Sequence, residues 1–167
     1  GPRSRIEEEL VKFPALASQV TIEHTDEYVS AGDRPSQALR HGRNSSMGLA
    51  LAAVRDGKAN VAVSAGNTGA LMALSKFTLR MLPGIDRPAL ISSLPTLRGE
   101  ACLLDLGANI ECDSNNLVQF AVMGAAYMRA VLGQNNPTVG LLNVGVEELK
   151  GSDTLRVAAR TLADSQH

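Results

Sequence analysis

Short aliphatic runs alternate along this chain with longer stretches in which apolar residues recur every three or four positions. Runs of the first kind are typical of strands buried in a sheet, and stretches of the second kind are typical of helices packed on one. The strands expected from the aliphatic runs are 20–25, 61–64, 89–93, 102–106 and 139–143. Strand, loop and helix in repeated order predict an α/β fold of βαβ units around a parallel sheet.

Capping residues mark where the helices begin and end. Ser45 and Ser46 are alternative caps for a helix that runs to Arg55, because a serine oxygen accepts a hydrogen bond from an amide of the first turn. Gly57 then supplies the left-handed stop. The other expected helices lie around 6–11 and span 36–40, 68–82, Ser114 or Asn115 to Gly133, and 153–163.

One expected helix carries a basic stripe beside an apolar one. Lys76 and Arg80 form the basic stripe, and Leu71, Leu74 and Phe77 form the apolar one. Helices of this kind lie on anionic membranes in some proteins. We expect the three apolar residues to face the core of the protein instead.

Composition narrows the class of protein. Hydrophobic residues make up 44% of the 167 positions and aromatic residues only 3%, with no Trp, so the core must consist of aliphatic side chains and Met. A net charge of -1 and few aromatic rings argue against nucleic-acid binding. No apolar run is long enough to span a bilayer.

The two cysteines give no sign of a metal site or of covalent catalysis. Cys102 and Cys112 form no C-x-x-C pair, and two thiols suit a reducing cytosol. Cys102 is expected to be buried and inert. The neighbours of Cys112, Glu111 and Asp113, should raise its pKa and make it a poor nucleophile.

The loop Ser64-Ala65-Gly66-Asn67-Thr68-Gly69 follows an expected strand and opens an expected helix. Because its side chains are small, the amides of residues 66 to 69 can point at one anion near the positive end of the helix. Thr68 is then either the helix cap or a donor to phosphate. A tight turn that needs small residues only for packing is the alternative, and no nucleotide motif is present.

Two further loops carry polar side chains directly after expected strands. Asp105 and Asn109 lie in the first, and Asn143, Glu147 and Lys150 lie in the second. The carboxyl ends of parallel strands share one edge of a sheet, so we expect all three loops to converge there. The alternatives are that the acid and amide bond nearby backbone, and that Glu147 and Lys150 form a solvated pair.

A cationic cluster is expected at Arg34, Arg40 and Arg43. Arginine binds phosphate in a fork geometry, so these residues are candidates for a clamp on the phosphates of a carrier or cofactor. A solvated helix face is the alternative.

Taken together, these segments resemble the bacterial phosphate acyltransferases, which are acyl-carrier-protein:phosphate transacylases. The resemblance covers essentially the whole chain in order. The residues that carry it are Ser45-Ser46-Met47, residues 63–71, Asp86-Arg87-Pro88-Ala89, Leu94-Pro95-Thr96, residues 104–109, residues 119–124, residues 140–145 and residues 147–151.

The resemblance implies a three-layer α/β/α sandwich, similar to the fold of isocitrate and isopropylmalate dehydrogenases. It implies transfer of a long-chain acyl group from acyl-carrier protein to inorganic phosphate, giving acyl phosphate for phospholipid synthesis, without a cofactor or metal. A homodimer in the cytoplasm, in peripheral contact with the inner face of the membrane, is also implied. Residues 1–167 are expected to be a single α/β domain, a fragment that lacks the family's first strand and C-terminal third.

Direct attack of phosphate on the thioester is the expected mechanism, in which the enzyme positions phosphate and stabilises the oxyanion. The expected catalytic residues are Asn67, Asp105, Asn109 and Lys150. Phosphate or substrate binding is expected from Ser64, Gly66, Thr68, Gly69, Asn143 and Glu147. Arg40 and Arg43 are expected to meet the acidic carrier protein.

Two alternative functions remain. One is a short-chain phosphotransacetylase or phosphate butyryltransferase, which performs the same chemistry on coenzyme A thioesters. The other is a non-catalytic scaffold that dimerises and recruits acyl-carrier protein.

Overall fold

The chain is an α/β protein whose internal contacts divide it into two compact units, Gly1–Arg80 and Met81–His167. The computed structural model describes residues 1–97, 99–147 and 150–165. Glu148 and Leu149 of the third candidate loop therefore lie outside the described residues. Each unit has its own elements and is considered by itself.

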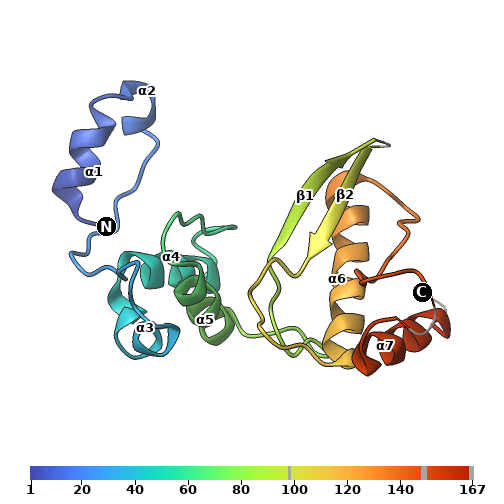
Figure 1. Ribbon diagram of the computed structural model, residues 1–167. Helices are drawn as coiled ribbons and strands as arrows, with labels where there is room; N and C mark the ends of the chain where they lie inside the picture. The colour runs from blue at the N-terminus through green and yellow to red at the C-terminus, as the bar shows by residue number, and fades with distance from the viewer. Residues whose placement is uncertain (98, 148–149, 166–167) are drawn as a thin grey trace. The chain divides into compact units, whose positions relative to one another are not determined.

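The N-terminal unit is helical and is built around the packing of three helices (Figure 1). Its elements are α1 (Arg3–Leu10), α2 (Pro14–Ala17), α3 (Pro35–His41), the 3-10 helix η1 (Gly42–Asn44), α4 (Ser46–Arg55) and α5 (Thr68–Leu79). Helices α3, α4 and α5 meet around a core of Ala38, Met47, Leu51, Ala70 and Leu74.

Ser45, not Ser46, caps α4. The Ser45 side chain is buried; its Oγ accepts a hydrogen bond from the Gly48 amide at 3.2 Å and donates to the Gly42 carbonyl at 2.6 Å. The same hydroxyl therefore satisfies a first-turn amide and joins α4 to η1. Asp56 and then Gly57, with φ of 71°, end the helix as expected.

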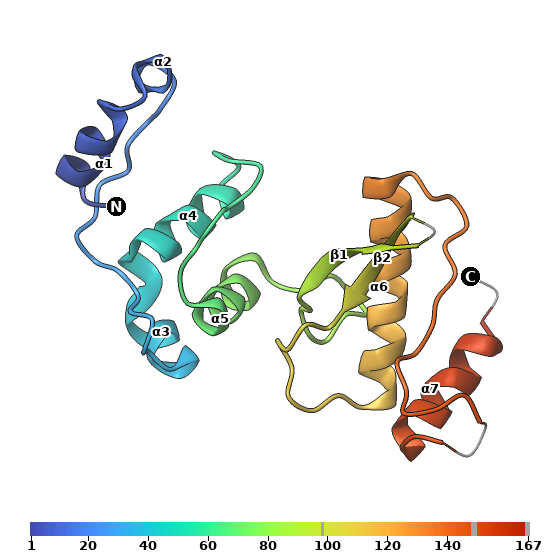
Figure 2. The same cartoon turned by 45° about the horizontal axis from the view of Figure 1, so that its top comes forward.

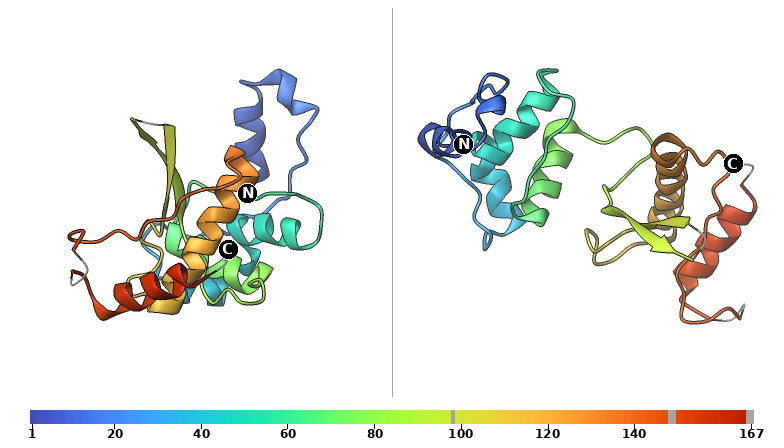
Figure 3. Two further views of the ribbon diagram at one scale, coloured as in Figure 1. Left: turned by 90° about the vertical axis from the view of Figure 1, so that its right-hand side faces the viewer. Right: turned by 90° about the horizontal axis from the view of Figure 1, so that it is seen from above.

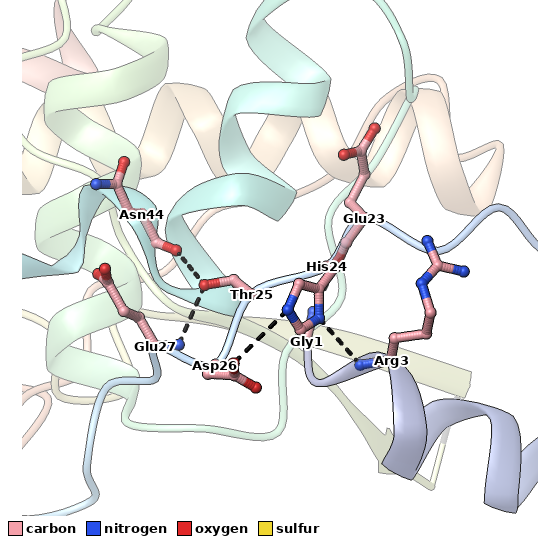
Figure 4. Close-up of polar contacts among 8 residues, drawn as sticks. All are labelled: Gly1, Arg3, Glu23, His24, Thr25, Asp26, Glu27 and Asn44. Atoms are coloured by element: carbon pink, nitrogen blue, oxygen red, sulfur yellow. Dashed lines mark hydrogen bonds and ion pairs between the residues drawn. The ribbon is translucent and has the colours of Figure 1, made fainter.

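The segment 20–25 was expected to be a strand, and that prediction is wrong. Its hydrogen bonds run to the chain start and to η1 rather than to a neighbouring strand (Figure 4). The N-terminal ammonium donates to the Glu23 carbonyl at 2.9 Å, and the Arg3 amide donates to His24 Nδ1 at 3.2 Å. Thr25 Oγ1 donates to the Asn44 carbonyl at 2.8 Å.

The C-terminal unit combines a two-stranded sheet with two helices. Its elements are β1 (Ile91–Thr96), β2 (Gly99–Leu104), α6 (Ser114–Leu132) and α7 (Asp153–Ala163). Figures 1 and 2 show α6 running along the hairpin, with α7 beside the N-terminal part of α6, and Figure 3 shows the same packing from two further sides. Asp113 caps α6, one residue before the expected serine, and Gly133 ends it in a left-handed conformation.

The two strands are antiparallel, so the prediction of a parallel pair is wrong. Ile91 lies opposite Leu104, and Thr96 lies opposite Gly99. Only the eight residues 94–101 separate the two runs that were expected to be strands. A parallel crossover needs about a dozen residues or more, whereas a hairpin needs very few. Gly99 permits the turn because its φ is 122°.

The segments 61–64 and 139–143 form no strand among the residues described. For this chain the prediction of strands there is wrong. A strand requires a neighbouring strand for its hydrogen bonds, and neither segment has one among the described residues. Their apolar side chains are correspondingly exposed: Val63 is 88% and Leu142 is 83% accessible.

Helix α5 differs from expectation at both ends and on one face. Asn67 rather than Thr68 caps it, and it ends at Leu79 because Arg80 adopts a φ of 66°. Leu74 is buried as expected, but Phe77 is 70% exposed, so its predicted place in the core is wrong. Across the described parts of the chain, no helix is both long and apolar enough to cross a bilayer.

Candidate functional site

Asn67 organises the small-residue loop that leads into α5. Its Oδ1 accepts a hydrogen bond from the Ala70 amide at 2.9 Å, which caps the helix. Its Nδ2 donates to the carbonyls of Ala31 at 3.0 Å and Asp33 at 2.9 Å. The side chain therefore ties the start of α5 to the turn before α3. Its expected role as a donor to substrate stays a prediction.

Three consecutive backbone amides at the start of α5 have no hydrogen-bond acceptor among the described residues: those of Asn67, Thr68 and Gly69. The Gly66 amide, by contrast, donates to Ser64 Oγ at 3.1 Å. Unsatisfied amides at a helix N-terminus carry the positive end of the helix dipole, which favours anions. The loop thus offers three such amides, one fewer than the sequence suggested.

A cavity of about 200 Å³ lies beside this loop. Its lining is mainly aliphatic, with two hydroxyls, and comprises Val29, Ser46, Met47, Ala50, Ala62, Val63, Ser64, Gly66 and Leu71. A Cβ added at Gly66 would lie 3.2 Å from Met47 Cε and 3.3 Å from Ser64 Oγ. A side chain at this position would therefore press on the cavity wall.

Packing accounts for one of the other small residues. A Cβ added at Gly69 would lie 3.1 Å from Pro35 Cγ, so glycine lets α5 approach the first turn of α3 closely. The Thr68 side chain is exposed. Packing therefore explains why Gly69 has no side chain, whereas the anion-site explanation concerns the backbone amides of the same loop.

Asp105 and Asn109 lie together and hold two loops against each other. The Asp105 carboxylate accepts hydrogen bonds from the amides of Leu90 at 2.9 Å, Ala108 at 3.1 Å and Asn109 at 2.7 Å. Asn109 Nδ2 donates to this carboxylate and to the Pro88 carbonyl, each at 2.9 Å. In this geometry both side chains bond nearby backbone, as the alternative interpretation stated.

The pKa of Asp105 reflects this environment. Burial raises the pKa of the carboxyl, but hydrogen bonds from the Leu90 amide and from Asn109 and Ala108 outweigh burial and hold the net pKa below its ordinary value. The carboxylate is therefore stabilised as an anion, which suits a structural anchor more than a proton donor.

Sequence reasoning missed a second polar network next to this loop. Asp86 Oδ2 accepts hydrogen bonds from Gln119 Nε2 at 2.7 Å and Asn115 Nδ2 at 3.1 Å, and Gln119 Oε1 accepts from the Asp86 amide at 2.8 Å. Gln119 is buried. The sequence carries little signal for this network, because Gln119 lies off the apolar stripe that Leu117, Phe120, Ala121 and Gly124 form on the helix.

Asn143 and Lys150 are brought together in the third loop. Asn143 Nδ2 donates to the Lys150 carbonyl at 3.2 Å, and the Lys150 amide donates to the Glu147 carbonyl at 2.9 Å. The side chains of Glu147 and Lys150 are exposed and form no ion pair with each other. The contacts of this loop are thus largely made by its backbone.

The expected arginine cluster is divided between two hollows. Arg40 lines one that also holds Asp26, Glu27 and Asp33, whereas Arg43 lines another on α4 and α5. The two guanidinium groups therefore have different electrostatic surroundings. Their contact with a carrier protein stays a prediction.

Both thiols have a raised pKa, as expected of poor nucleophiles, but Cys102 is half-buried instead of buried, and Glu111 is not among the groups that raise the pKa of Cys112. Burial raises the pKa of Cys102. Burial also raises the pKa of Cys112, and the negative charges of Asp105 and Asp113 raise it further. Within the described ranges, no group of His, Cys, Asp and Glu is arranged to hold a metal ion.

The candidate residues belong to different units. The Ser64–Gly69 loop, Arg40 and Arg43 lie in the N-terminal unit, and Asp105, Asn109, Asn143, Glu147 and Lys150 lie in the C-terminal unit. The structure brings together pairs within a unit. Convergence of the three loops on one site stays a prediction.

Comparison with known proteins gives one consistent result. The sequence profile described as fatty acid synthesis protein matches residues 1–167. A phosphate acyltransferase of Paramagnetospirillum magneticum is 60% identical over 99% of this chain and 47% of its own length. Those of Rhodospirillum centenum and Bradyrhizobium diazoefficiens are 60% and 58% identical over 99% and 97% of this chain, in each case 46% of the relative. The chain thus spans about half the length of these curated relatives.

Replacing Asp105 by Asn should destabilise the C-terminal unit by about 1–3 kcal/mol near neutral pH, because an amide group cannot accept all the hydrogen bonds of the carboxylate. The folded pKa is lowered, so the carboxylate's contribution is complete above its unfolded pKa of about 3.9 and is lost as pH falls through the folded pKa. The gap between wild type and variant should therefore narrow on acidification.

Urea unfolding followed by circular dichroism at several pH values measures this gap. Asp164→Asn is the matched control, since Asp164 is exposed at the end of α7. Equal stability of wild type and Asp105→Asn at neutral pH would show that the Asp105 contacts do not anchor the unit.

Proposed function

This chain belongs to the fatty acid synthesis protein family, and from that membership we propose that it forms part of an enzyme that transfers a long-chain acyl group from acyl-carrier protein to inorganic phosphate. The product is an acyl phosphate for phospholipid synthesis. The relatives are phosphate acyltransferases by name, which supports phosphate as the acceptor and acyl transfer as the reaction class. Acyl-carrier protein as the donor and a long acyl chain are both part of the proposal.

The observation that carries the proposal is the row of three amides at the start of α5. The amides of Asn67, Thr68 and Gly69 have no acceptor among the described residues, and the loop before them has small side chains that leave an anion room to approach. Phosphate fits such a site because it accepts several hydrogen bonds and carries the charge that the helix end favours. The proposal places phosphate here.

The chemical step requires no covalent enzyme intermediate. A phosphate oxygen attacks the thioester carbonyl carbon, a carbon–oxygen bond forms, the carbon–sulfur bond breaks, and the carrier leaves as a thiol after its sulfur takes up a proton. The protein positions phosphate and stabilises the negative charge that develops on the carbonyl oxygen. Backbone amides are suited to both tasks because they are fixed before the reaction begins.

Residues of the other loops have supporting roles in this proposal. Asp105 and Asn109 act as positioning residues, which is supported by their hydrogen bonds to the 88–90 backbone. In the complete enzyme Lys150 is assigned the role of neutralising phosphate charge, and Asn143 and Glu147 that of binding substrate. Arg40 and Arg43 meet the acidic carrier protein. We also propose that the complete protein is a homodimer in peripheral contact with the cytoplasmic membrane.

In the complete protein, we propose a three-layer α/β/α sandwich. Two aliphatic segments, 61–64 and 139–143, have exposed side chains and no strand partner among the described residues. The relatives have about as much sequence again beyond the match, and it can supply the missing strands. Pairing would bury Val63 and Leu142, which favours it through the hydrophobic effect.

Amide hydrogen exchange tests this arrangement of strands. Residues 61–64 and 139–143 should exchange slowly in the complete protein and rapidly in the 167-residue chain, because only ladder hydrogen bonds protect them. The amides in the middle of α6 should be protected in both and serve as the internal control. Rapid exchange of both segments in the complete protein would contradict the sandwich.

The activity is tested in the complete protein with acyl-carrier protein as donor and hydroxylamine to trap acyl phosphate. Gly66→Val should lower the rate on the order of a hundredfold, the loss typical of one oxyanion donor, because the new side chain presses on the loop wall and displaces the amides. Ala15→Val is the control, since Ala15 is exposed on α2, outside both this loop and the 30–33 turn that Asn67 binds.

Melting temperatures must accompany these rates, so that only folded variants are compared. If a folded Gly66→Val enzyme has the wild-type rate and an unchanged dependence on phosphate, then phosphate does not bind at this loop. Turnover with short-chain acyl-coenzyme A alone would favour the phosphotransacetylase alternative. Binding of carrier without any turnover would favour the scaffold.

A further inference from the structure

A groove of about 770 Å³ lies on the N-terminal unit, along α4 and α5 and apart from the cavity beside the Ser64–Gly69 loop. Small-molecule sites in proteins occupy roughly 300–1,000 Å³. The groove is formed entirely within one unit. Neither the proposed phosphate site nor the proposed carrier contact accounts for its apolar floor.

The floor of the groove is apolar and includes an exposed aromatic ring. Leu49 and Ala52 of α4 face Leu74 and Phe77 of α5, with Leu39 of α3 beside them. Phe77 is 70% accessible to solvent, and the phenyl ring of such a side chain is costly to leave in water. An apolar ligand lying in the groove would cover it.

The rim of the groove is positively charged. Arg43, Lys58 and Arg80 line it, and none of these cations forms an ion pair within the described part of the chain. Two opposing charges, Arg55 and Asp56, are bonded to each other at 2.7 Å. Glu23 remains as a carboxylate on the rim, which leaves cations in excess although the whole chain has a net charge of -1.

We propose that this groove binds a single-chain amphiphile with an anionic head group. The alkyl chain lies on Leu49, Ala52 and Phe77, and the head group lies between Lys58 and Arg80. The groove combines an apolar floor with a cationic rim. A neutral apolar ligand would contact only the floor, and a small inorganic anion would contact only the rim. A bilayer would need a convex apolar face, and an acidic polypeptide would leave the floor unexplained.

The inference does not depend on the proposed reaction. A long-chain acyl phosphate belongs to the same chemical class, so in the proposed enzyme the groove would hold a product or a related fatty anion. Binding is measured with an unreactive probe, so failure of the groove and failure of the enzyme are separate results.

The test is titration calorimetry on the 167-residue chain with monododecyl phosphate below its micelle concentration. We expect saturable binding with one site per chain. Dodecyltrimethylammonium has the same tail and the opposite charge, and inorganic phosphate has the head without the tail. Each should bind at least about tenfold more weakly, since each loses one of the two contributions.

Variants assign the binding to the groove. Phe77→Ser should weaken binding of monododecyl phosphate about tenfold, whereas Phe13→Ser, which removes an exposed ring outside the groove, should not. Lys58→Ser with Arg80→Gly should weaken it by a similar factor, and Arg5→Ser should not. Glycine is chosen at Arg80 because the backbone φ there is 66°.

Several results would overturn the proposal. Equal affinity for the cationic and anionic amphiphiles would show that the cationic rim does not bind the head group. Unchanged binding by Phe77→Ser and by Lys58→Ser with Arg80→Gly would show that the ligand binds outside the groove. Binding to phosphatidylglycerol vesicles without binding of the monomeric probe would make the surface a membrane contact. Binding of polyglutamate alone would make it a surface for acidic polypeptides. The ligand comparison uses the wild-type chain, so it remains decisive if a variant unfolds.

Discussion

The side chain of Asn67 fixes the geometry on which the N-terminal unit depends. Its oxygen caps α5, and its amide nitrogen donates to three carbonyls of the turn before α3. With the first turn of α5 held in this way, Ala70 and Leu74 enter the core, and the amides of Asn67, Thr68 and Gly69 keep no acceptor among the described residues. Asn67 therefore positions the backbone of the candidate site, and its catalytic role stays a prediction.

Asp105 plays the corresponding part in the C-terminal unit. Its carboxylate is saturated by backbone amides and by Asn109, and the adjacent Asp86–Gln119 network ties the same region to α6. The side chains of Asn67, Asp105 and Asn109 are thus occupied by hydrogen bonds to nearby backbone, whereas those of Thr68, Glu147 and Lys150 are exposed. Our proposal therefore assigns anion binding first to the backbone amides at the start of α5, which Asn67 holds in place.

Local features could be predicted from the sequence, and long-range pairing could not. The caps and stops at Ser45, Gly57 and Gly133 and the helix 153–163 follow from residues within one turn, so they were predicted correctly or nearly so. Strand pairing depends on segments that are distant in the sequence, and an aliphatic run alone does not indicate which segment it pairs with. The eight-residue spacing between the two expected strands is too short for a parallel crossover, and the prediction of a parallel sheet did not take this signal into account. For Asn67 and Asp105, residue type suggested chemistry, whereas only the surrounding hydrogen bonds show that they hold the backbone.

The central claim is that the start of α5 binds phosphate through the amides of Asn67, Thr68 and Gly69. Titration of the ¹⁵N-labelled 167-residue chain with inorganic phosphate, at constant ionic strength, tests it most directly by nuclear magnetic resonance. The amide signals of these three residues should shift together and saturate, while those at the start of α6, which the Asp113 carboxylate caps, should not. Shifts that are absent, that do not saturate, or that are equal at both helices would contradict the account.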